Sequence, residues 1–321
     1  MRYKVMISAP YMQPVVDRFR PIFREQDIDL VVPRVRERLE EADLLDLIPE
    51  IDGVICGDDR FTKRVLERAK QLKVIVKWGT GVDSIDLESA MQRGVSVYNT
   101  PNAFTHPVAD SVLGYILSFA RRILWSTEDM RSGKWQKEPC VALRECTLGI
   151  VGVGNIGKAV ARRAMAFGMK IMGNDIVQIS SSFVSETNMK VTSLKELLDA
   201  SDFVTLHCDL NPKSFHLIGE RDLATMKPTA YIINTSRGPV IDEKALINAL
   251  KTNGIAGAAL DVYEDEPLPK TSPLRRMRNC LLAPHNANSS PEAWEFVHEN
   301  SIRNLLKGLC LKEYKVGEPR K

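Results

Sequence analysis

The stretch that decides the fold is TLGIVGVGNIGKAVARRAMAFG, residues 147–168. It has the pattern of a short buried strand, a turn containing Gly152, Gly154 and Gly157, and a helix that opens at Asn155 and Ile156. A glycine turn lets the backbone approach a pyrophosphate closely, and the N–H groups at the helix start hold the negative charge. The stretch therefore predicts a dinucleotide-binding turn.

An acidic residue stands where such a turn requires one. Asp175 ends the next predicted strand, and its carboxylate would accept hydrogen bonds from the adenosine ribose hydroxyls. Ile176 and Val177 follow, with no nearby arginine to neutralise a 2′-phosphate, so the sequence predicts NAD rather than NADP. The alternative is a tight strand–helix turn that binds no ligand. The combination of strand, glycines, helix and acid favours the cofactor.

Strands alternate with helices along most of the chain. Predicted strands cover residues 3–7, 28–32, 53–56, 73–76 and 96–98, and then 147–151, 170–173, 203–207, 231–234, 255–260 and 280–283. Predicted helices include 62–70, 155–167, 194–200 and 243–251, with Thr62 and Asp242 as N-caps. This alternation predicts the α/β class, with two doubly wound parallel-sheet domains.

Two longer apolar segments, residues 108–123 and 291–309, bracket the second set of strands. If the last helix returns to the first set, the chain crosses between domains twice. The predicted domains are then residues 1–100 plus 285–321, and residues 101–284. Ligands commonly bind where such domains meet.

Composition limits the classes of function. The 321 residues are 44% hydrophobic and 26% charged, with 44 Lys and Arg against 41 Asp and Glu, a net charge of +3. This balance argues against a nucleic-acid partner held through phosphates, and no apolar run is long enough to cross a membrane. The six cysteines form no CxxC pair, so no metal site is predicted. We expect reduced core thiols in a cytoplasmic protein.

Candidate chemistry follows three successive predicted strands. Arg237 lies after the first, Glu266 after the second and His285 after the third. A guanidinium can bind a carboxylate through two parallel hydrogen bonds, an imidazole can exchange a proton near neutral pH, and a carboxylate beside it favours the charged form. This set suits interconversion of a hydroxy acid and a keto acid. Taken singly, each is more often a surface charge or an ordinary hydrogen bonder.

The motifs IVGVGNIG, INTSRGPVIDEKAL, GAALDVYEDEP and LLAPH occur in this order, with KWGTGVDSID before them. On these motifs the chain resembles the D-isomer-specific 2-hydroxyacid dehydrogenase family over nearly its whole length. The resemblance implies a Rossmann NAD-binding domain inserted in a flavodoxin-like substrate domain. It also implies hydride transfer between nicotinamide C4 and substrate C2, and a homodimer formed through the cofactor domain, with residues 131–135 in the dimerisation arm.

The resemblance also assigns roles to residues. It implies that Arg237 binds the substrate carboxylate, that His285 is the general acid/base and that Glu266 is its partner. Substrate contacts are expected from Thr80 and Gly81 together with Arg237 and His285. Trp78 either lines the substrate pocket or packs within its domain, and the pocket is favoured. The expected cofactor-binding residues are Thr105, Gly152, Gly154, Asn155, Ile156, Gly157, Asp175, His207, Thr235, Arg237, Asp261 and His285.

Some positions depart from the family pattern. Phe104, Asp110 and Asp209 replace the usual Asn, Glu and Pro, and residues 286–288 replace an apolar residue and glycines. Only a short charged tail follows the last predicted helix, so no regulatory domain of about 80 residues is expected there.

The loop after the third predicted strand carries Asp58 and Asp59, which would repel a phosphate, although a solvated turn explains them equally well. We therefore expect a small unphosphorylated acid such as glyoxylate or hydroxypyruvate. The alternatives are phosphoglycerate dehydrogenase and a non-catalytic NAD-sensing protein of the same fold. Formate oxidation is disfavoured, because that chemistry is associated with Gln where this chain has Glu266.

Overall fold

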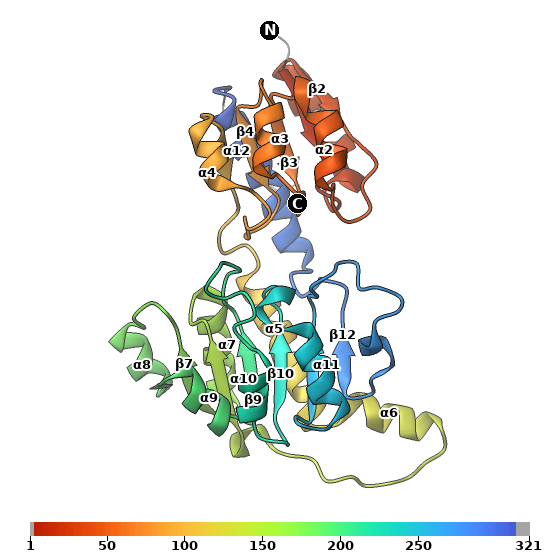
Figure 1. Cartoon of the computed structure of the whole chain (residues 1–321), viewed down its shortest axis with the longest axis vertical. Coiled ribbons are helices and arrows are strands. Elements are labelled where there is room, and N and C mark those ends of the chain that lie inside the picture. The colour runs from red at the N-terminus through yellow and green to blue at the C-terminus, as the bar shows by residue number, and fades with distance from the viewer. Residues whose placement is uncertain (1–2, 313–321) are drawn as a thin grey trace, which may run out of the picture. The chain divides into compact units, whose positions relative to one another are not determined.

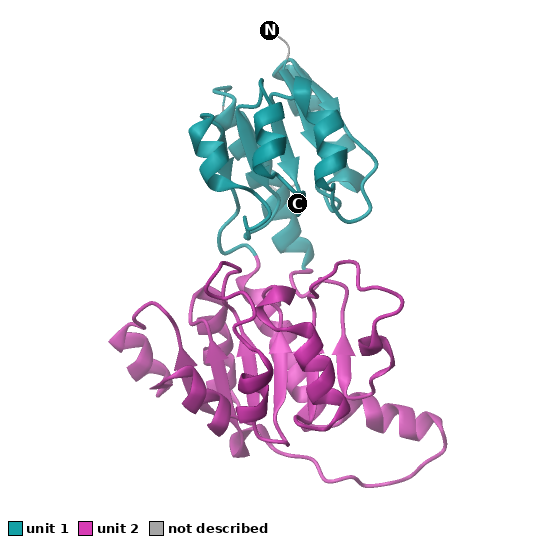
Figure 2. Ribbon diagram, viewed as in Figure 1, with its two compact units in different colours: residues 1–103, 290–321 teal, residues 104–289 magenta. Residues whose placement is uncertain are grey.

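The computed structural model describes residues 3–312. The short charged tail expected from the sequence falls mostly outside these residues. The chain divides into two compact units (Figure 2). Unit 1 comprises Met1–Ala103 and Ser290–Lys321, and unit 2 comprises Phe104–Ser289. The chain therefore leaves unit 1 once and returns to it once.

Unit 1 is built on a five-stranded parallel sheet with the order β2-β1-β3-β4-β5. Its strands are β1 (Tyr3–Ile7), β2 (Ile28–Val31), β3 (Gly53–Cys56), β4 (Val74–Lys77) and β5 (Ser96–Tyr98). This order is that of flavodoxin-like folds, in which ligands bind beyond the carboxyl ends of the strands. β3 and β4 are buried throughout, as central parallel strands require.

Helices cover both faces of this sheet (Figure 1). One face packs against α2 (Glu41–Leu47), α3 (Lys63–Arg68) and α4 (Leu87–Gln92). The opposite face of the sheet packs against α12 (Pro291–Gly308), where an added Cβ on Gly53 would meet Leu305 at 2.9 Å. α1 (Arg20–Glu25) and the 3-10 turns η1 (Gln13–Arg18) and η2 (Ile48–Glu50) complete the unit. Thr62 caps α3 as predicted, accepting from the Val65 N–H.

Unit 2 is built on a seven-stranded parallel sheet with the order β12-β11-β10-β9-β6-β7-β8. Its strands are β6 (Thr147–Val151), β7 (Lys170–Asn174), β8 (Lys190–Val191), β9 (Phe203–Leu206), β10 (Tyr231–Asn234), β11 (Gly257–Leu260) and β12 (Cys280–Leu282). The order reverses at β6, so the crevice beside its carboxyl end is the expected ligand site. Together the two sheets confirm the predicted α/β class.

Two apolar cores hold the helices of unit 2 against its sheet. One face carries α5 (Thr105–Ala120), α7 (Asn155–Ala166) and α8 (Ser181–Thr187). The other carries α9 (Leu194–Ala200), α10 (Glu220–Thr225) and α11 (Glu243–Lys251), the last capped by Asp242 as predicted. α6 (Ile123–Arg131) and the 3-10 turns η3 (Leu143–Glu145), η4 (Gly238–Val240) and η5 (Pro273–Arg276) lie in the connections.

Three details correct the sequence-based expectations. The second sheet has seven strands rather than six, because β8 is only two exposed residues and carries no hydrophobic pattern. The apolar segment 108–123 is interrupted, since α5 ends at Ala120 and Arg122 adopts a left-handed conformation with φ 51° before α6. Cys140 and Cys310 are exposed, so they are not core thiols, although all six cysteines are unpaired.

Within residues 3–312, the structure contains no helix with the length and apolar character that crossing a membrane requires.

Candidate active site

The glycine turn of unit 2 leaves one side open to a ligand. Gly152 has φ 89°, and a Cβ there would lie 2.7 Å from the carbonyl carbon of His207. A Cβ on Gly157 would lie 2.2 Å from the Gly152 carbonyl oxygen, so the start of α7 packs tightly on the turn. A Cβ on Gly154 would meet nothing within 4 Å. The first and third glycines thus shape the turn, while the second borders open space that suits a pyrophosphate.

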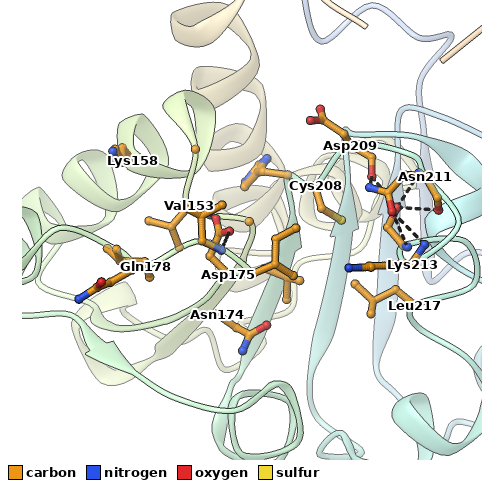
Figure 3. A pocket seen from close by; sticks show the side chains of 18 residues that line it. Val153, Lys158, Asn174, Asp175, Gln178, Cys208, Asp209, Asn211, Lys213 and Leu217 are labelled. Atoms are coloured by element: carbon orange, nitrogen blue, oxygen red, sulfur yellow. Dashed lines mark hydrogen bonds between the residues drawn. The ribbon is translucent and has the colours of Figure 1, made fainter. Parts of the chain in front are cut away.

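A cavity of about 420 Å³ adjoins this turn (Figure 3). It is lined by residues of the turn, by residues 174–179 at the end of β7 and beyond, and by residues of the 207–217 loop after β9. Asp175 lies between them, and its Oδ2 accepts a hydrogen bond from the Val153 N–H at 2.6 Å. Its Oδ1 accepts from the Val177 N–H at 2.8 Å. These bonds fix the carboxylate beside the glycine turn, where the ribose of a dinucleotide would lie.

His207 lines this cavity with an uncharged imidazole. Burial lowers the pKa of its imidazole to about 3, so the ring is uncharged at neutral pH. Its Nε2 lies 3.0 Å from Thr205 Oγ1, and its Nδ1 is buried without a partner among the described residues. A buried polar atom without a partner is costly unless a ligand or water satisfies it. The glycine turn, Asp175 and this unsatisfied nitrogen together fit a dinucleotide.

Arg237 lies in a loop that is ordered by hydrogen bonds from the Asn234 side chain. Asn234 is 1% exposed and ends β10. Its Oδ1 accepts from the Ser236 N–H and hydroxyl at 3.0 and 2.8 Å, and its Nδ2 donates to the Arg237 carbonyl at 2.9 Å. The Arg237 guanidinium donates to the Ser236 carbonyl at 2.8 Å. The sequence placed Asn234 within a family motif, but only the structure shows that it orders this loop.

Asp261 anchors the loop that carries His285. Asp261 follows β11 and is 1% exposed. Its two carboxylate oxygens accept from the N–H groups of Asn286 and Ala287, both at 2.9 Å, and its carbonyl accepts from the His285 N–H at 2.8 Å. Burial raises the pKa of Asp261, and the two N–H donors oppose that effect. From α5, the Ser111 hydroxyl donates to the Ala287 carbonyl at 3.2 Å.

His285 and Glu266 form a hydrogen-bonded pair. His285 Nδ1 lies 2.8 Å from Glu266 Oε2, and Glu266 Oε1 accepts from the Tyr263 N–H at 2.9 Å. His285 itself has φ 51°, in the left-handed region. Arg237, Glu266 and His285 follow β10, β11 and β12, which are neighbours in one parallel sheet. Their loops therefore emerge at the same edge of the sheet, where His285 contacts Glu266 through Nδ1.

Three other predicted cofactor residues of unit 2 lie at the starts of helices and one lies after a strand. Thr105 begins α5, and Asn155 begins α7 with Ile156 beside it. Thr235 follows β10, and its hydroxyl oxygen is buried with no partner among the described residues. That atom is a second polar group that a ligand would satisfy.

The predicted substrate residues of unit 1 follow β4. Thr80 Oγ1 donates to the Thr100 carbonyl at 3.2 Å, and Gly81 is half-buried. Trp78 is only 4% exposed, and its indole N–H donates to His298 Nδ1 at 3.0 Å. Its ring also packs on Tyr11 at 5.3 Å between centroids. Packing within unit 1 accounts for Trp78, and its contact with a substrate stays a prediction.

The loop carrying Asp58 and Asp59 is not the solvated turn that the sequence allowed. Asp59 is fully buried, with Oδ2 2.5 Å from the Ser8 hydroxyl and Oδ1 2.7 Å from the Leu39 N–H. Asp58 forms an ion pair with Lys77, 2.9 Å between Oδ1 and Nζ. Repulsion of a phosphate by two open carboxylates is therefore not supported. The sequence could not reveal this contact network, because its partners Ser8, Leu39 and Lys77 come from three distant segments.

Burial makes Asp59 a pH-dependent element of stability. It raises the pKa of the carboxyl from 3.8 to about 6, mainly through desolvation. The pKa of Asp59 is higher in the folded protein than in the unfolded chain, so its protonation stabilises the fold. This stabilisation is complete below about pH 4 and is lost as pH rises through about 6. We expect the unfolding free energy of the wild type, relative to Asp59→Asn, to fall by about 3 kcal/mol across that range. Urea unfolding of both proteins at about pH 4 and about pH 7.5 measures it; a pH-independent difference would contradict it.

Comparison with known proteins agrees with this geometry. Residues 113–287 match the family described as D-isomer specific 2-hydroxyacid dehydrogenase, NAD binding domain. The chain is 42% identical over 276 residues to a glyoxylate reductase of Korarchaeum cryptofilum, covering 84% of this chain and 80% of that protein. It is 34% identical to a hydroxypyruvate reductase of Thermotoga maritima, covering 96% and 99%. A solved D-lactate dehydrogenase from Aquifex aeolicus, complexed with NAD and lactic acid, superposes with a TM-score of 0.85 at 25% identity, covering 96% and 95%.

A parallel sheet with a glycine turn, an acidic residue held beside that turn and a histidine–carboxylate pair fits an NAD-binding oxidoreductase. The chain belongs to the D-isomer specific 2-hydroxyacid dehydrogenase family. The family, the enzyme class and NAD as the cofactor, all expected from the sequence, are thereby confirmed.

Proposed function

We propose that the protein is an NAD-dependent 2-keto acid reductase, or D-2-hydroxyacid dehydrogenase, for a small unphosphorylated acid such as glyoxylate or hydroxypyruvate. The observation that carries the proposal is the 2.8 Å contact between His285 and Glu266, whose loops follow β12 and β11, beside the loop of Arg237 after β10. The names of the similar glyoxylate and hydroxypyruvate reductases support the substrate class.

Each residue of the site has a definite task in this proposal. The bound nicotinamide cofactor supplies the hydride for reduction and accepts it for oxidation. Arg237 binds the substrate carboxylate through its guanidinium and stabilises charge that develops on the carbonyl oxygen. His285 donates the proton from Nε2 to that oxygen, and Glu266, in contact with Nδ1, orients the ring. Asp261 holds the His285 loop through the N–H groups of Asn286 and Ala287.

A panel of 2-keto acids tests the proposal. The purified protein is assayed for NADH oxidation with glyoxylate, hydroxypyruvate, pyruvate and phosphohydroxypyruvate, and the same panel is repeated with NADPH. We expect the highest kcat/KM with NADH and glyoxylate or hydroxypyruvate. Activity confined to phosphohydroxypyruvate would replace the proposal by the phosphoglycerate alternative. NADH binding without activity on any acid would replace it by an NAD-sensing role.

Cofactor preference is assigned to the charge of Asp175. Asp175→Asn keeps an oxygen that can accept from the Val153 N–H, but it loses the negative charge that opposes a 2′-phosphate. Hydrogen bonds to charged groups contribute about 1.5–3 kcal/mol, so we expect the ratio of kcat/KM for NADH over NADPH to fall by about 10- to 100-fold. Steady-state kinetics with both cofactors measures the ratio. An unchanged ratio would remove this role from Asp175.

We further propose a homodimer formed through unit 2, in a cytoplasmic protein. Supporting the dimer, large apolar side chains are exposed on α6 and the segment after it, including Ile123, Met130 and Trp135 at 49, 53 and 79%. Six unpaired cysteines support a reducing compartment. Light scattering after gel filtration tests the dimer. A monomeric mass for the wild type at micromolar concentration would contradict it.

A further inference from the structure

A second histidine–carboxylate pair lies outside the catalytic residues of unit 2. His216 Nε2 is 2.8 Å from Glu264 Oε1, and both side chains are about one-third exposed. The Phe215 ring stacks on the His216 ring at 4.0 Å between centroids, which fixes the plane of the imidazole. No sequence motif singled out His216. Its contacts nevertheless reach two of the three loops that carry the proposed chemistry.

The side chain of His216 reaches the loop of Glu266. Its partner Glu264 is two residues before Glu266, and Glu264 Oε1 also accepts from the Glu243 N–H at 3.1 Å. In return, the Glu264 N–H donates to Glu243 Oε2 at 3.2 Å. The loop after β11 is thus tied both to His216 and to the start of α11.

The backbone of His216 reaches the loop of Arg237. The His216 N–H donates to the Pro239 carbonyl at 2.8 Å, and two residues later the Ile218 N–H donates to the Val240 carbonyl at 3.1 Å. Pro239 and Val240 belong to η4, which begins immediately after Arg237. The segment containing His216 therefore runs alongside the arginine loop.

The two loops also pack directly on each other. A Cβ on Gly238 would lie 1.9 Å from the Tyr263 carbonyl carbon, so the arginine loop rests on the backbone of the glutamate loop. Tyr263 in turn donates its N–H to Glu266 Oε1 at 2.9 Å. A small displacement of either loop therefore changes where Glu266 meets His285.

We propose that His216 is a positioning residue, which ties the Arg237 loop through its backbone and the Glu266 loop through Glu264. Its imidazole bond holds Glu266 in reach of His285 Nδ1. The kinetic consequence rests on the proposed function, whereas the consequence for the Glu266–His285 hydrogen bond does not. His216 has φ 50°, so a substitution there carries the strain of a left-handed residue. The test therefore needs two variants that share this strain.

His216→Phe and His216→Gln form that matched pair. Phe keeps a ring to stack on Phe215 and removes the donor, whereas Gln places an amide N–H near the position of Nε2. We expect His216→Phe to lower kcat for 2-keto acid reduction by about 10-fold or more, as the loss of a hydrogen bond to a charged group predicts. The dissociation constant of NADH should stay unchanged. His216→Gln should retain kcat within about twofold of the wild type.

A proton NMR measurement tests the geometry without any activity. The Nδ1–H proton of His285, bonded to Glu266, should give a far-downfield resonance, assigned by its loss in His285→Gln. We expect this resonance in the wild type and in His216→Gln, and its loss or broadening in His216→Phe. An unchanged resonance in His216→Phe would overturn the proposal, as would equal losses of resonance and kcat in the Gln and Phe variants. If the wild type reduces no 2-keto acid, the proposed function fails while this comparison still decides the role of His216.

Discussion

Replacing His285 by alanine is expected to lower kcat for 2-keto acid reduction by about 10²- to 10⁴-fold, the usual effect of losing a positioned general acid. The variant removes the imidazole that Glu266 holds at 2.8 Å. It retains the backbone N–H that donates to the Asp261 carbonyl. The dissociation constant of NADH should therefore remain close to that of the wild type. Steady-state kinetics and fluorescence titration with NADH measure the two quantities.

His285→Asn is the control for backbone strain. Position 285 has φ 51°, a conformation that asparagine tolerates better than alanine. Both variants should lose turnover to a similar extent, because neither supplies an imidazole. If either retains near-normal kcat, His285 is not the general acid. If turnover falls only in the alanine variant, backbone strain rather than lost proton transfer is the cause.

Replacing Arg237 by glutamine is expected to lower kcat/KM by about 10²- to 10³-fold, as with loss of a donor that stabilises developing oxyanion charge. KM should rise as well, since the substrate carboxylate loses its cationic partner. Asn234 donates to the backbone carbonyl of Arg237, a contact that the variant retains, so the loop should keep its course. Kinetics with glyoxylate or hydroxypyruvate at saturating NADH measures both effects.

Arg237→Lys is the matched control. Lysine keeps the positive charge but cannot form two parallel hydrogen bonds with a carboxylate. We expect it to recover part of the loss in KM and little of the loss in kcat. Full recovery by lysine would show that charge alone suffices. Wild-type kinetics in the glutamine variant would exclude Arg237 from substrate binding.

Much of the fold was predictable because the pattern is local. Buried strands such as β3 and β6 are β-branched or small runs between turn residues, and their bounds match the expected ones. The Thr62 and Asp242 caps were equally local, since each accepts from an N–H three residues on. β8 escaped prediction because two exposed residues carry no periodic signal.

The site was predictable in part for the same reason. Residues that follow adjacent parallel strands meet at one edge, so Arg237, Glu266 and His285 could be grouped from their order alone. The contacts that support these residues could not be predicted from the sequence. Asp261 accepts from the Asn286 N–H, and the buried Asp59 accepts from Ser8 and Leu39. These contacts join segments far apart in the chain, and only tertiary packing brings them together.

A crystal structure of the protein with NAD and oxamate, an unreactive analogue of a 2-keto acid, tests the proposed chemistry most directly. We expect the oxamate carboxylate to bind the Arg237 guanidinium, with the oxamate carbonyl oxygen within hydrogen-bonding distance of His285 Nε2. We also expect the adenosine ribose to bind Asp175 and the Glu266–His285 hydrogen bond to be intact. Oxamate bound away from Arg237 and His285, with NAD in the glycine-turn cavity, would rule out the proposed roles of both residues.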